Sequence, residues 1–322
     1  MFRVDATSGE LQTVASFDAR SGGNSRAGVV ANGGLLYGTT QTNGARNNGT
    51  VYRVNPSSGE IAAVAAFDPT LATPAGLALA GPYLYGTTPA GGGSGSKGTV
   101  FRVDPSSGAM TTLFKFASPY ANGATPRSPL ALHGSYLYGT TYEAGTLGRG
   151  TVFRIDPSDG TLTNLASVFS GSGNAPQYPN SGLIALGSFL YGTTRFGGQF
   201  GKGAVYKIDP ETRAVTTVAS FDGPHGEYPG DGGLATDGTS LFGTATGGGA
   251  FGHGTVFQVD AAAGKLVTVM SFALSDGDSP VGGVLVVGPY LYGTTQYGGS
   301  KGGGTLFRVA IPKPRRHAAS RR

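Results

Sequence analysis

The sequence contains no cysteine and no tryptophan, and only 13% of its 322 residues are charged. Without cysteine the chain cannot form disulfides or thiolate–metal sites, and without tryptophan it has no indole ring to stack on a sugar. No apolar run approaches the ~18 residues of a membrane span, and residues 1–5 lack the charged and then apolar layout of a signal peptide. The sequence therefore predicts neither a transmembrane segment nor a disulfide framework.

Charge of one sign is concentrated at one end of the chain. The formal net charge is +5, from 23 basic and 18 acidic residues. The segment after Ala310 has no acidic residue and contains Lys313, Arg315, Arg316, Arg321 and Arg322. The rest of the chain is neutral, and we expect no nucleic-acid binding by the folded body, because such binding needs excess basic charge on the fold itself. We expect residues 311–322 to form a basic, disordered tail, since proline alternates with charge there.

Glycine is abundant, with 58 copies, and much of it belongs to a repeat. The pentapeptide Leu-Tyr-Gly-Thr-Thr, or a close variant, occurs six times, with its aromatic residue at Tyr37, Tyr85, Tyr138, Tyr191, Phe242 and Tyr292. Successive copies are 48, 53, 53, 51 and 50 residues apart. A period near fifty residues indicates a repeat architecture in which each unit is one supersecondary element.

Each unit contains four short strands. A short apolar strand, as at residues 130–132, comes first, and the pentapeptide forms the second strand. The third strand, as at residues 101–103, is joined by a proline-led turn that ends in glycine to the fourth strand, as at residues 110–116. Such turns are typical of β-hairpins, and four-stranded antiparallel units of ~40–50 residues are typical of β-propeller blades.

We therefore predict an all-β protein, a β-propeller of six four-stranded blades in a single domain at residues 1–310. The chain begins with a third and a fourth strand and ends with a first, a second and a third. We predict that the N-terminal strand at residues 11–17 completes the C-terminal blade at residues 284–309, because this closure would tie the ring shut and hide sheet edges. We expect a monomer.

The unit Leu-Tyr-Gly-Thr-Thr, then Gly-Gly, then Gly-Thr-Val-Phe-Arg-Val-Asp-Pro-Ser-Ser-Gly resembles the GloVer tandem repeat of bacterial choice-of-anchor proteins. The resemblance covers residues 1–310 and recurs in every predicted blade. It implies a secreted or surface-exposed propeller of unassigned activity. The expected localisation is thus extracellular or at the cell surface, although the sequence shows neither an export signal nor an apolar anchor.

The alternation of strand direction separates two kinds of loop. The loops between second and third strands, and those from a fourth strand to the next blade, share one face and are long and variable. Because function concentrates in loops on rigid scaffolds, we expect binding on this long-loop face. Cations and aromatic rings there suit a glycan or peptide ligand, and solvated loop side chains are the plainer alternative. The candidates are Lys97, Arg149, Lys202, His253, Tyr142, Phe196, Phe251 and Tyr297.

The least repetitive segment, residues 222–231, offers a catalytic alternative. It holds His225, Glu227 and Asp231 in one loop, where a carboxylate could act as general acid or base with the histidine as partner. The same three side chains could bind a metal. No specific spacing motif supports either role, and a flexible polar loop explains the composition as well. We therefore predict no metal site and no cofactor.

Three hypotheses for the function stay open at the level of sequence. The favoured one is a non-enzymatic propeller that binds a glycan or a protein on its long-loop face. The second is a polysaccharide-degrading enzyme that uses the loop at residues 222–231. The third is a structural spacer without a ligand of its own.

Overall fold

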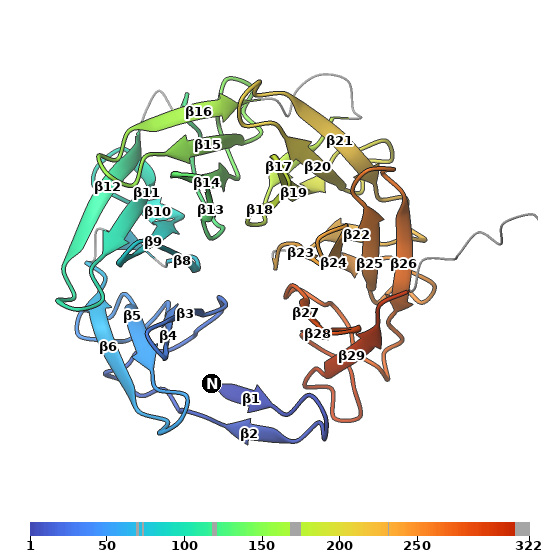
Figure 1. The fold of residues 1–322 in the computed structure, drawn as a ribbon, viewed down its shortest axis with the longest axis horizontal. Helices are drawn as coiled ribbons and strands as arrows, with labels where there is room; N and C mark the ends of the chain where they lie inside the picture. The colour runs from blue at the N-terminus through green and yellow to red at the C-terminus, as the bar shows by residue number, and fades with distance from the viewer. Residues whose placement is uncertain (69–70, 73, 118–120, 168–174, 231, 313–322) are drawn as a thin grey trace, which may run out of the picture.

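The computed structural model describes residues 1–68, 71–72, 74–117, 121–167, 175–230 and 232–312, and within them it contains strands and no helix. The strands form six sheets that stand as blades around a common axis, with a separate two-stranded hairpin beside them in the ring (Figure 1). The predicted all-β propeller of six blades is confirmed. Nothing helical in these residues could cross a membrane. The predicted tail lies outside the described residues, apart from Ile311 and Pro312.

Each blade runs from an inner first strand to an outer last strand (Figure 1). Blade 1 consists of β3 (Val30–Asn32), β4 (Leu35–Thr39), β5 (Thr50–Val54) and β6 (Ile61–Ala66). Blade 2 consists of β8 (Leu77–Ala80), β9 (Tyr83–Thr88), β11 (Ser96–Val103) and β12 (Met110–Ala117). Blade 3 consists of β13 (Ala131–His133), β14 (Tyr136–Thr141), β15 (Thr151–Ile155) and β16 (Leu162–Ala166).

The second half of the ring continues the same order. Blade 4 consists of β18 (Ile184–Leu186), β19 (Phe189–Phe196), β20 (Ala204–Ile208) and β21 (Val215–Ser220). Blade 5 consists of β23 (Ala235–Thr236), β24 (Ser240–Gly247), β25 (Thr255–Asp260) and β26 (Leu266–Ser271). In the part of the chain that the structure describes, blade 6 consists of β27 (Leu285–Val287), β28 (Tyr290–Thr294) and β29 (Leu306–Ala310).

Four very short strands lie in the long loops. They are β7 (Leu71–Ala72), β10 (Ala90–Gly91), β17 (Gln177–Pro179) and β22 (Glu227–Pro229). β17 pairs with the far end of β19, and β22 pairs with the far end of β24. Since β19 and β24 are second strands, β17 and β22 lie on the inner side of their blades, at the long-loop face.

The pentapeptide forms the second strand of every blade, and its glycine makes room for an aromatic ring. Gly139 of β14 is the cross-strand partner of Phe153 in β15. A Cβ placed on Gly139 would be 2.4 Å from the Phe153 ring, which is fully buried. Glycine suits this strand position because the ring occupies the space above its backbone. The hydroxyls of Thr141 and Thr151 lie 2.9 Å apart in the buried sheet, so that one can donate to the other.

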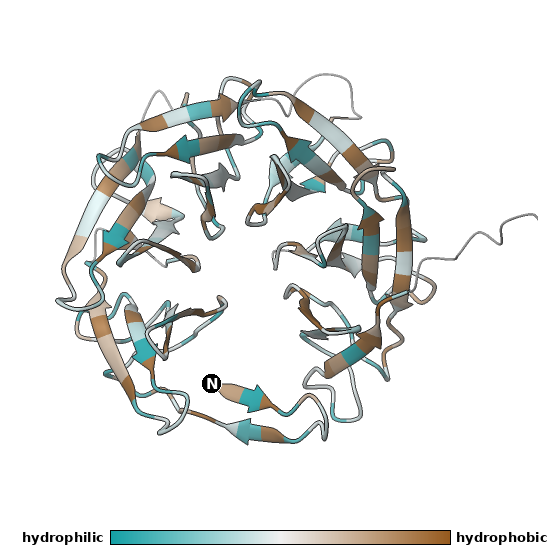
Figure 2. Cartoon of the chain, viewed as in Figure 1, coloured by the Kyte–Doolittle hydropathy of each residue, from teal (hydrophilic) through white to brown (hydrophobic). Residues whose placement is uncertain are grey.

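The hydrophobic core is divided among the junctions between neighbouring units of the ring. Six clusters of buried residues each join two successive units, from the hairpin and blade 1 to blades 5 and 6. Figure 2 shows hydrophobic segments in strands all around the ring, as this division requires. The fold is therefore stabilised by packing between sheets and has no single central core.

An edge-on pair of aromatic rings marks most of these junctions. The phenylalanine that ends a fourth strand packs against the third-strand ring of the next blade, and such pairs add about 0.5–1.5 kcal/mol beyond their burial. Ring centroids are 4.9–5.4 Å apart in the pairs Phe17–Tyr52, Phe67–Phe101, Phe116–Phe153, Phe221–Phe257 and Phe272–Phe307.

The ring closes differently from the prediction. β1 (Phe2–Val4) and β2 (Leu11–Thr13) pair only with each other, and β27, β28 and β29 form a three-stranded sheet. Residues 11–17 therefore do not complete the C-terminal blade, because β1 already occupies the edge of β2 that β29 would need. The hairpin stands in a place of its own between blade 6 and blade 1 (Figure 1), where the third and fourth strands of a seventh blade would lie.

Short-range hydrogen bonds hold the aspartates at the turns between third and fourth strands. Asp104 accepts from the Ser106 hydroxyl at 2.6 Å and from the Ser106 N–H at 2.8 Å, and these bonds lower the pKa of Asp104 to about 2. The Ser158 hydroxyl likewise lowers the pKa of Asp156, and the backbone N–H of residue 211 lowers the pKa of Asp209. A carboxyl whose folded-state pKa lies below its ordinary value stabilises the fold when it is ionised.

We expect acid to destabilise the propeller through these turns. The contribution of Asp104 is fully present above about pH 4 and is lost as the pH falls toward about 2. Asparagine accepts the same bonds without titrating, as Asn55 does in blade 1 at 2.9 Å from the Ser57 nitrogen. The triple variant Asp104→Asn, Asp156→Asn and Asp209→Asn should therefore show a smaller fall in urea midpoint over this range. An equal fall in the urea midpoint of the wild-type protein and the triple variant would contradict this role of the turns.

Candidate ligand-binding site

The long-loop face is built from joints between neighbouring blades. At four joints a residue before a proline adopts a left-handed backbone conformation and donates its N–H to a carbonyl of the previous blade, at 2.8–3.2 Å. The donor and acceptor residues are Thr125 and Lys97, Tyr178 and Arg149, Tyr228 and Lys202, and Ser279 and His253. The four cationic positions singled out in the sequence are therefore structural parts of these joints.

The side chains at three of these cationic positions reach an acceptor on the next blade. The contacts are Arg149 with Gln177, Lys202 with Glu227 at 2.6 Å, and His253 with Asp278 at 3.4 Å. The hydrogen bond to Glu227 raises the pKa of Lys202. Lys97 is exposed. The structure thus places the predicted cations on one face but gives three of them a neighbour that a ligand would have to replace or share.

Aromatic side chains form a row across blades 3, 4 and 5 on this face. Neighbouring ring centroids are 5.2, 6.0 and 5.6 Å apart in the order Tyr142, Tyr178, Phe196 and Tyr228. At one end, the Arg127 guanidinium lies 4.3 Å from the centroid of the Tyr142 ring. All four rings are partly exposed. We call these four residues the aromatic row, and they present a strip of apolar surface to solvent.

Two members of the aromatic row hold a backbone conformation that tyrosine rarely adopts. The φ angles of Tyr178 and Tyr228 are 59° and 54°. A bulky residue in this region is an outlier, a following proline restricts the residue further, and such strain costs about 1–3 kcal/mol. The same position in blades 1, 3 and 6 holds Asn24, Thr125 and Ser279. Asparagine suits this backbone better, so the needs of the joint do not explain the tyrosines.

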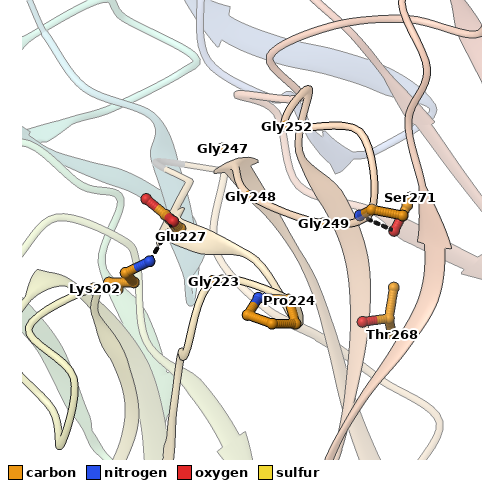
Figure 3. Close-up of a pocket in the computed structure, with 11 residues that line it drawn as sticks. Lys202, Gly223, Pro224, Glu227, Gly247, Gly248, Gly249, Gly252, Thr268 and Ser271 are labelled. Carbon is orange, nitrogen blue, oxygen red and sulfur yellow. Dashed lines mark hydrogen bonds and ion pairs between the residues drawn. The ribbon is translucent and has the colours of Figure 1, made fainter.

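A hollow of about 800 Å³ lies between Lys202 of blade 4 and the loops of blade 5 (Figure 3), and its lining residue Glu227 is next to Tyr228 in the sequence. Its wall is mostly glycine backbone and small residues, and Lys202 and Glu227 are the charged residues among the described ones that line it. Ser271 also lines it, and its hydroxyl accepts from the Ala250 N–H at 3.2 Å. The hollow therefore offers a few polar groups, among them the Lys202–Glu227 pair and the Ser271 hydroxyl.

The candidate catalytic residues have separate partners. His225 Nδ1 is 2.8 Å from Asp222 Oδ2, whereas Glu227 is bound by Lys202. Burial acts to raise the pKa of Asp222, but hydrogen bonds from His225 outweigh it and lower that pKa. Asp231 lies outside the described residues. In the part of the chain that the structure describes, no group of three histidine, cysteine, aspartate or glutamate side chains could hold a metal ion.

The repeated sequence was compared with known protein families. The sequence matches the family described as the Gloeobacter/Verrucomicrobia repeat over residues 1–195 and 178–318. The chain belongs to this family. The GloVer resemblance is thereby confirmed. No curated protein matches the sequence.

Solved propeller structures share the fold of this Gloeobacter/Verrucomicrobia repeat protein at low sequence identity. An oligogalacturonate lyase from Vibrio parahaemolyticus has a TM-score of 0.60 at 11% identity, over 97% of this chain and 83% of that chain. The computationally designed Ika8 protein has a TM-score of 0.55 at 13% identity, over 89% and 71%. A chain of a nidogen/laminin complex has a TM-score of 0.50 at 16% identity, over 75% and 76%. These similarities show the fold alone.

Sequence analysis found part of the aromatic row and missed the rest. It named Tyr142 and Phe196 but not Tyr178, Tyr228 or Arg127. A signal was present, because tyrosine precedes the loop proline in blades 4 and 5 of this Gloeobacter/Verrucomicrobia repeat protein, where a small polar residue stands in blades 3 and 6.

Two predicted aromatic candidates lie apart from the row. Phe251 is 62% exposed and Tyr297 is 53% exposed. The Tyr297 hydroxyl accepts a hydrogen bond from Gln296 at 3.1 Å. Among the described residues, no ring contact connects either side chain to the aromatic row.

Proposed function

We propose that this protein is a non-enzymatic propeller that binds a glycan chain along the aromatic row. The observation that carries the proposal is the pair Tyr178 and Tyr228, whose backbones are strained at a position where other blades use small polar residues. Strained residues cluster at functional sites, where the strain is offset by the surrounding structure. A ligand that contacts the two rings explains why tyrosine is kept there.

The chemistry of the row suits a sugar chain. Aromatic faces pack against the C–H faces of sugar rings by dispersion, and the phenolic hydroxyls remain available for hydrogen bonds. Arg127 at one end of the row and Lys202 near the other supply charged donors for hydroxyl or carboxylate groups. A neutral or acidic glycan therefore fits better than a basic one. The proposed setting is a bacterial surface or the extracellular space, as the GloVer resemblance implies.

Binding without catalysis is favoured by the arrangement of the acidic loop. A general acid and base that act together need to lie within reach of one reacting group. His225 and Glu227 are instead engaged by Asp222 and Lys202, at 2.8 and 2.6 Å. The oligogalacturonate lyase shares only the fold with this chain, so it adds no argument for cleavage.

The double variant Tyr178→Asn and Tyr228→Asn should bind the glycan more weakly and remain folded. Each aromatic contact contributes about 0.5–1.5 kcal/mol beyond its area, so we expect the affinity to fall by about tenfold or more. The free energy of unfolding should be unchanged or higher by about 1 kcal/mol, because asparagine tolerates the left-handed backbone. A glycan array would identify the ligand, and calorimetry and urea unfolding would measure the two effects.

Phe251→Asn is the matched control, because it removes an exposed ring from the same face outside the row. It should leave the affinity unchanged. Unchanged affinity in the double variant, or no glycan bound by the wild-type protein, would contradict the proposal. Cleaved sugar released from a polysaccharide, and lost in Glu227→Gln, would support the enzyme hypothesis instead.

A further inference from the structure

One junction of the ring lacks the packing found at the others. Buried clusters join the hairpin to blade 1 and each blade to the next, but within the described residues none joins blade 6 to the hairpin. The Arg308 side chain of β29 donates to the carbonyl of Ala6 in the hairpin at 3.4 Å. Within the described residues blade 6 has no fourth strand, and β29 pairs as a strand only with β28. The edge of β29 that points away from the axis of the ring is therefore open.

Side chains around this open edge are exposed where their counterparts are buried. Leu306 of β29 is 41% exposed, whereas its counterpart Val256 in β25 is fully buried. Phe2 holds the third-strand aromatic position of the hairpin and is 52% exposed, whereas Phe257 at this position of blade 5 is fully buried. A fourth strand covers both of these positions at a complete junction. The exposure of Leu306 and of Phe2 is therefore expected if that strand is missing between blade 6 and the hairpin.

The glycines in the turns between third and fourth strands also indicate this gap. At complete junctions the glycine of the turn between third and fourth strands touches the previous blade's fourth strand. A Cβ on Gly264 would be 2.6 Å from the carbonyl oxygen of Val218, and a Cβ on Gly108 would be 2.3 Å from that of Val64. The matching Gly9 of the hairpin has open space around it.

The gap has the width of a normal junction. The Tyr292 hydroxyl of blade 6 donates to the carbonyl of Ala6 in the hairpin at 3.2 Å. Tyr85 of blade 2 makes the same contact with Pro157 of blade 3 at 3.4 Å. A groove of about 210 Å³ lies between the hairpin turn and β29, and Leu306 lines it. The hairpin turn therefore stands at the usual distance from blade 6.

The complete blades show what kind of strand fits. In blade 5, β26 pairs antiparallel with β25 over residues 266–271, and Phe272 then packs on the ring of Phe307 in the next blade with centroids 5.0 Å apart. A strand placed in the same way on β29 would cover Leu306. Its final phenylalanine would meet the exposed ring of Phe2.

We propose that the open edge of β29 binds an extended segment of a partner protein by β-strand addition. The segment has the pattern of the propeller's own fourth strands, with β-branched and hydroxyl residues followed by phenylalanine. Main-chain hydrogen bonds to β29 supply affinity, and the phenylalanine against Phe2 supplies specificity. The proposal continues the existing blade-to-blade interface across the one junction where it is interrupted. An open edge is otherwise a site for uncontrolled pairing.

The test uses the full chain and a labelled synthetic peptide, Lys-Leu-Val-Thr-Val-Met-Ser-Phe-Ala, with the sequence of residues 265–273. We expect saturable binding in fluorescence anisotropy and about tenfold slower hydrogen exchange at the backbone amides of residues 305–310. The Phe272→Ser analogue of the peptide should bind about tenfold more weakly, because it lacks the edge-on ring pair. In the protein, Phe2→Ser should weaken binding similarly, whereas Phe251→Ser removes a comparably exposed ring elsewhere and should not.

Several results would overturn the proposal. No saturable binding, or equal binding of the Phe272→Ser analogue, would show that the edge does not recognise this pattern. A dimer in light scattering, with residues 305–310 protected in the absence of peptide, would assign the edge to a second copy of the chain. The same protection in a monomer would show that the chain covers its own edge.

Discussion

Phe153→Ala should lower the free energy of unfolding by about 3–5 kcal/mol, one of the largest losses expected for a single substitution in this propeller. Phe153 is fully buried, fills the space above Gly139, and packs edge-on against Phe116 of the preceding blade at 5.4 Å. Alanine would leave a cavity between two sheets whose own hydrogen bonds prevent them from closing in. Both the lost burial and the cavity therefore contribute. Urea unfolding at neutral pH would measure the loss.

Phe2→Ala is the matched control for this experiment. Phe2 has the same strand position in the hairpin, but it is 52% exposed and no fourth strand packs on it. Its replacement should cost less than about 1 kcal/mol. Similar losses at the two positions would contradict the conclusion that the core lies at the junctions between blades.

Gly203→Ala should destabilise the protein by about 2–4 kcal/mol and weaken ligand binding as well. Gly203 has a φ of 103°, and its new Cβ would be 2.5 Å from Pro229 Cδ and 2.7 Å from the carbonyl oxygen of Thr194. Backbone strain and steric overlap act together at this joint. Because the same joint holds Lys202 and Tyr228, a shift there would also displace one end of the aromatic row. Urea unfolding and calorimetric titration with the glycan would measure the two effects.

Gly303→Ala in the corresponding loop of blade 6 provides the comparison. No positive φ is found at Gly303, and a Cβ there would meet no atom within 4 Å. We expect its stability to change by less than about 0.5 kcal/mol. A comparable loss of stability in Gly203→Ala and Gly303→Ala would mean that any substitution in these loops is destabilising. It would contradict the conclusion that the joint at Gly203 is specifically required.

Much of the architecture was predictable because it is repeated. Six spaced copies of the pentapeptide, each followed by a turn and two further strand patterns, predicted the second strands that the structure confirms from β4 to β28. The closure of the ring was not predictable in this way. A hairpin at one end and three strands at the other are compatible with a shared blade or with two separate ones. The hydrogen bonds between β1 and β2 show that the two ends form separate sheets. The number of strands in the sequence does not predict this pairing.

The candidate site was predictable only in outline. Lys202 and Arg149 were found because they vary between repeats, but their partners Glu227 and Gln177 lie 25 and 28 residues further along the chain, on the next blade. Local sequence cannot show that such side chains meet. The sequence shows Tyr178 and Tyr228 where other blades have a small polar residue before proline, but only the structure shows that their φ angles are positive.

The repeat unit, the order of strands within a blade and the face that carries the long loops all follow from the amino-acid sequence alone. These features depend on short-range periodicity and on the alternation of strand direction, and both can be derived from neighbouring residues in the sequence. The three-dimensional fold was needed to show which loop side chains meet, how the two ends of the chain share the ring, and which strand edge is open among the described residues. These features depend on contacts between different blades, and the spacing and registration of blades arise from packing that no single repeat encodes.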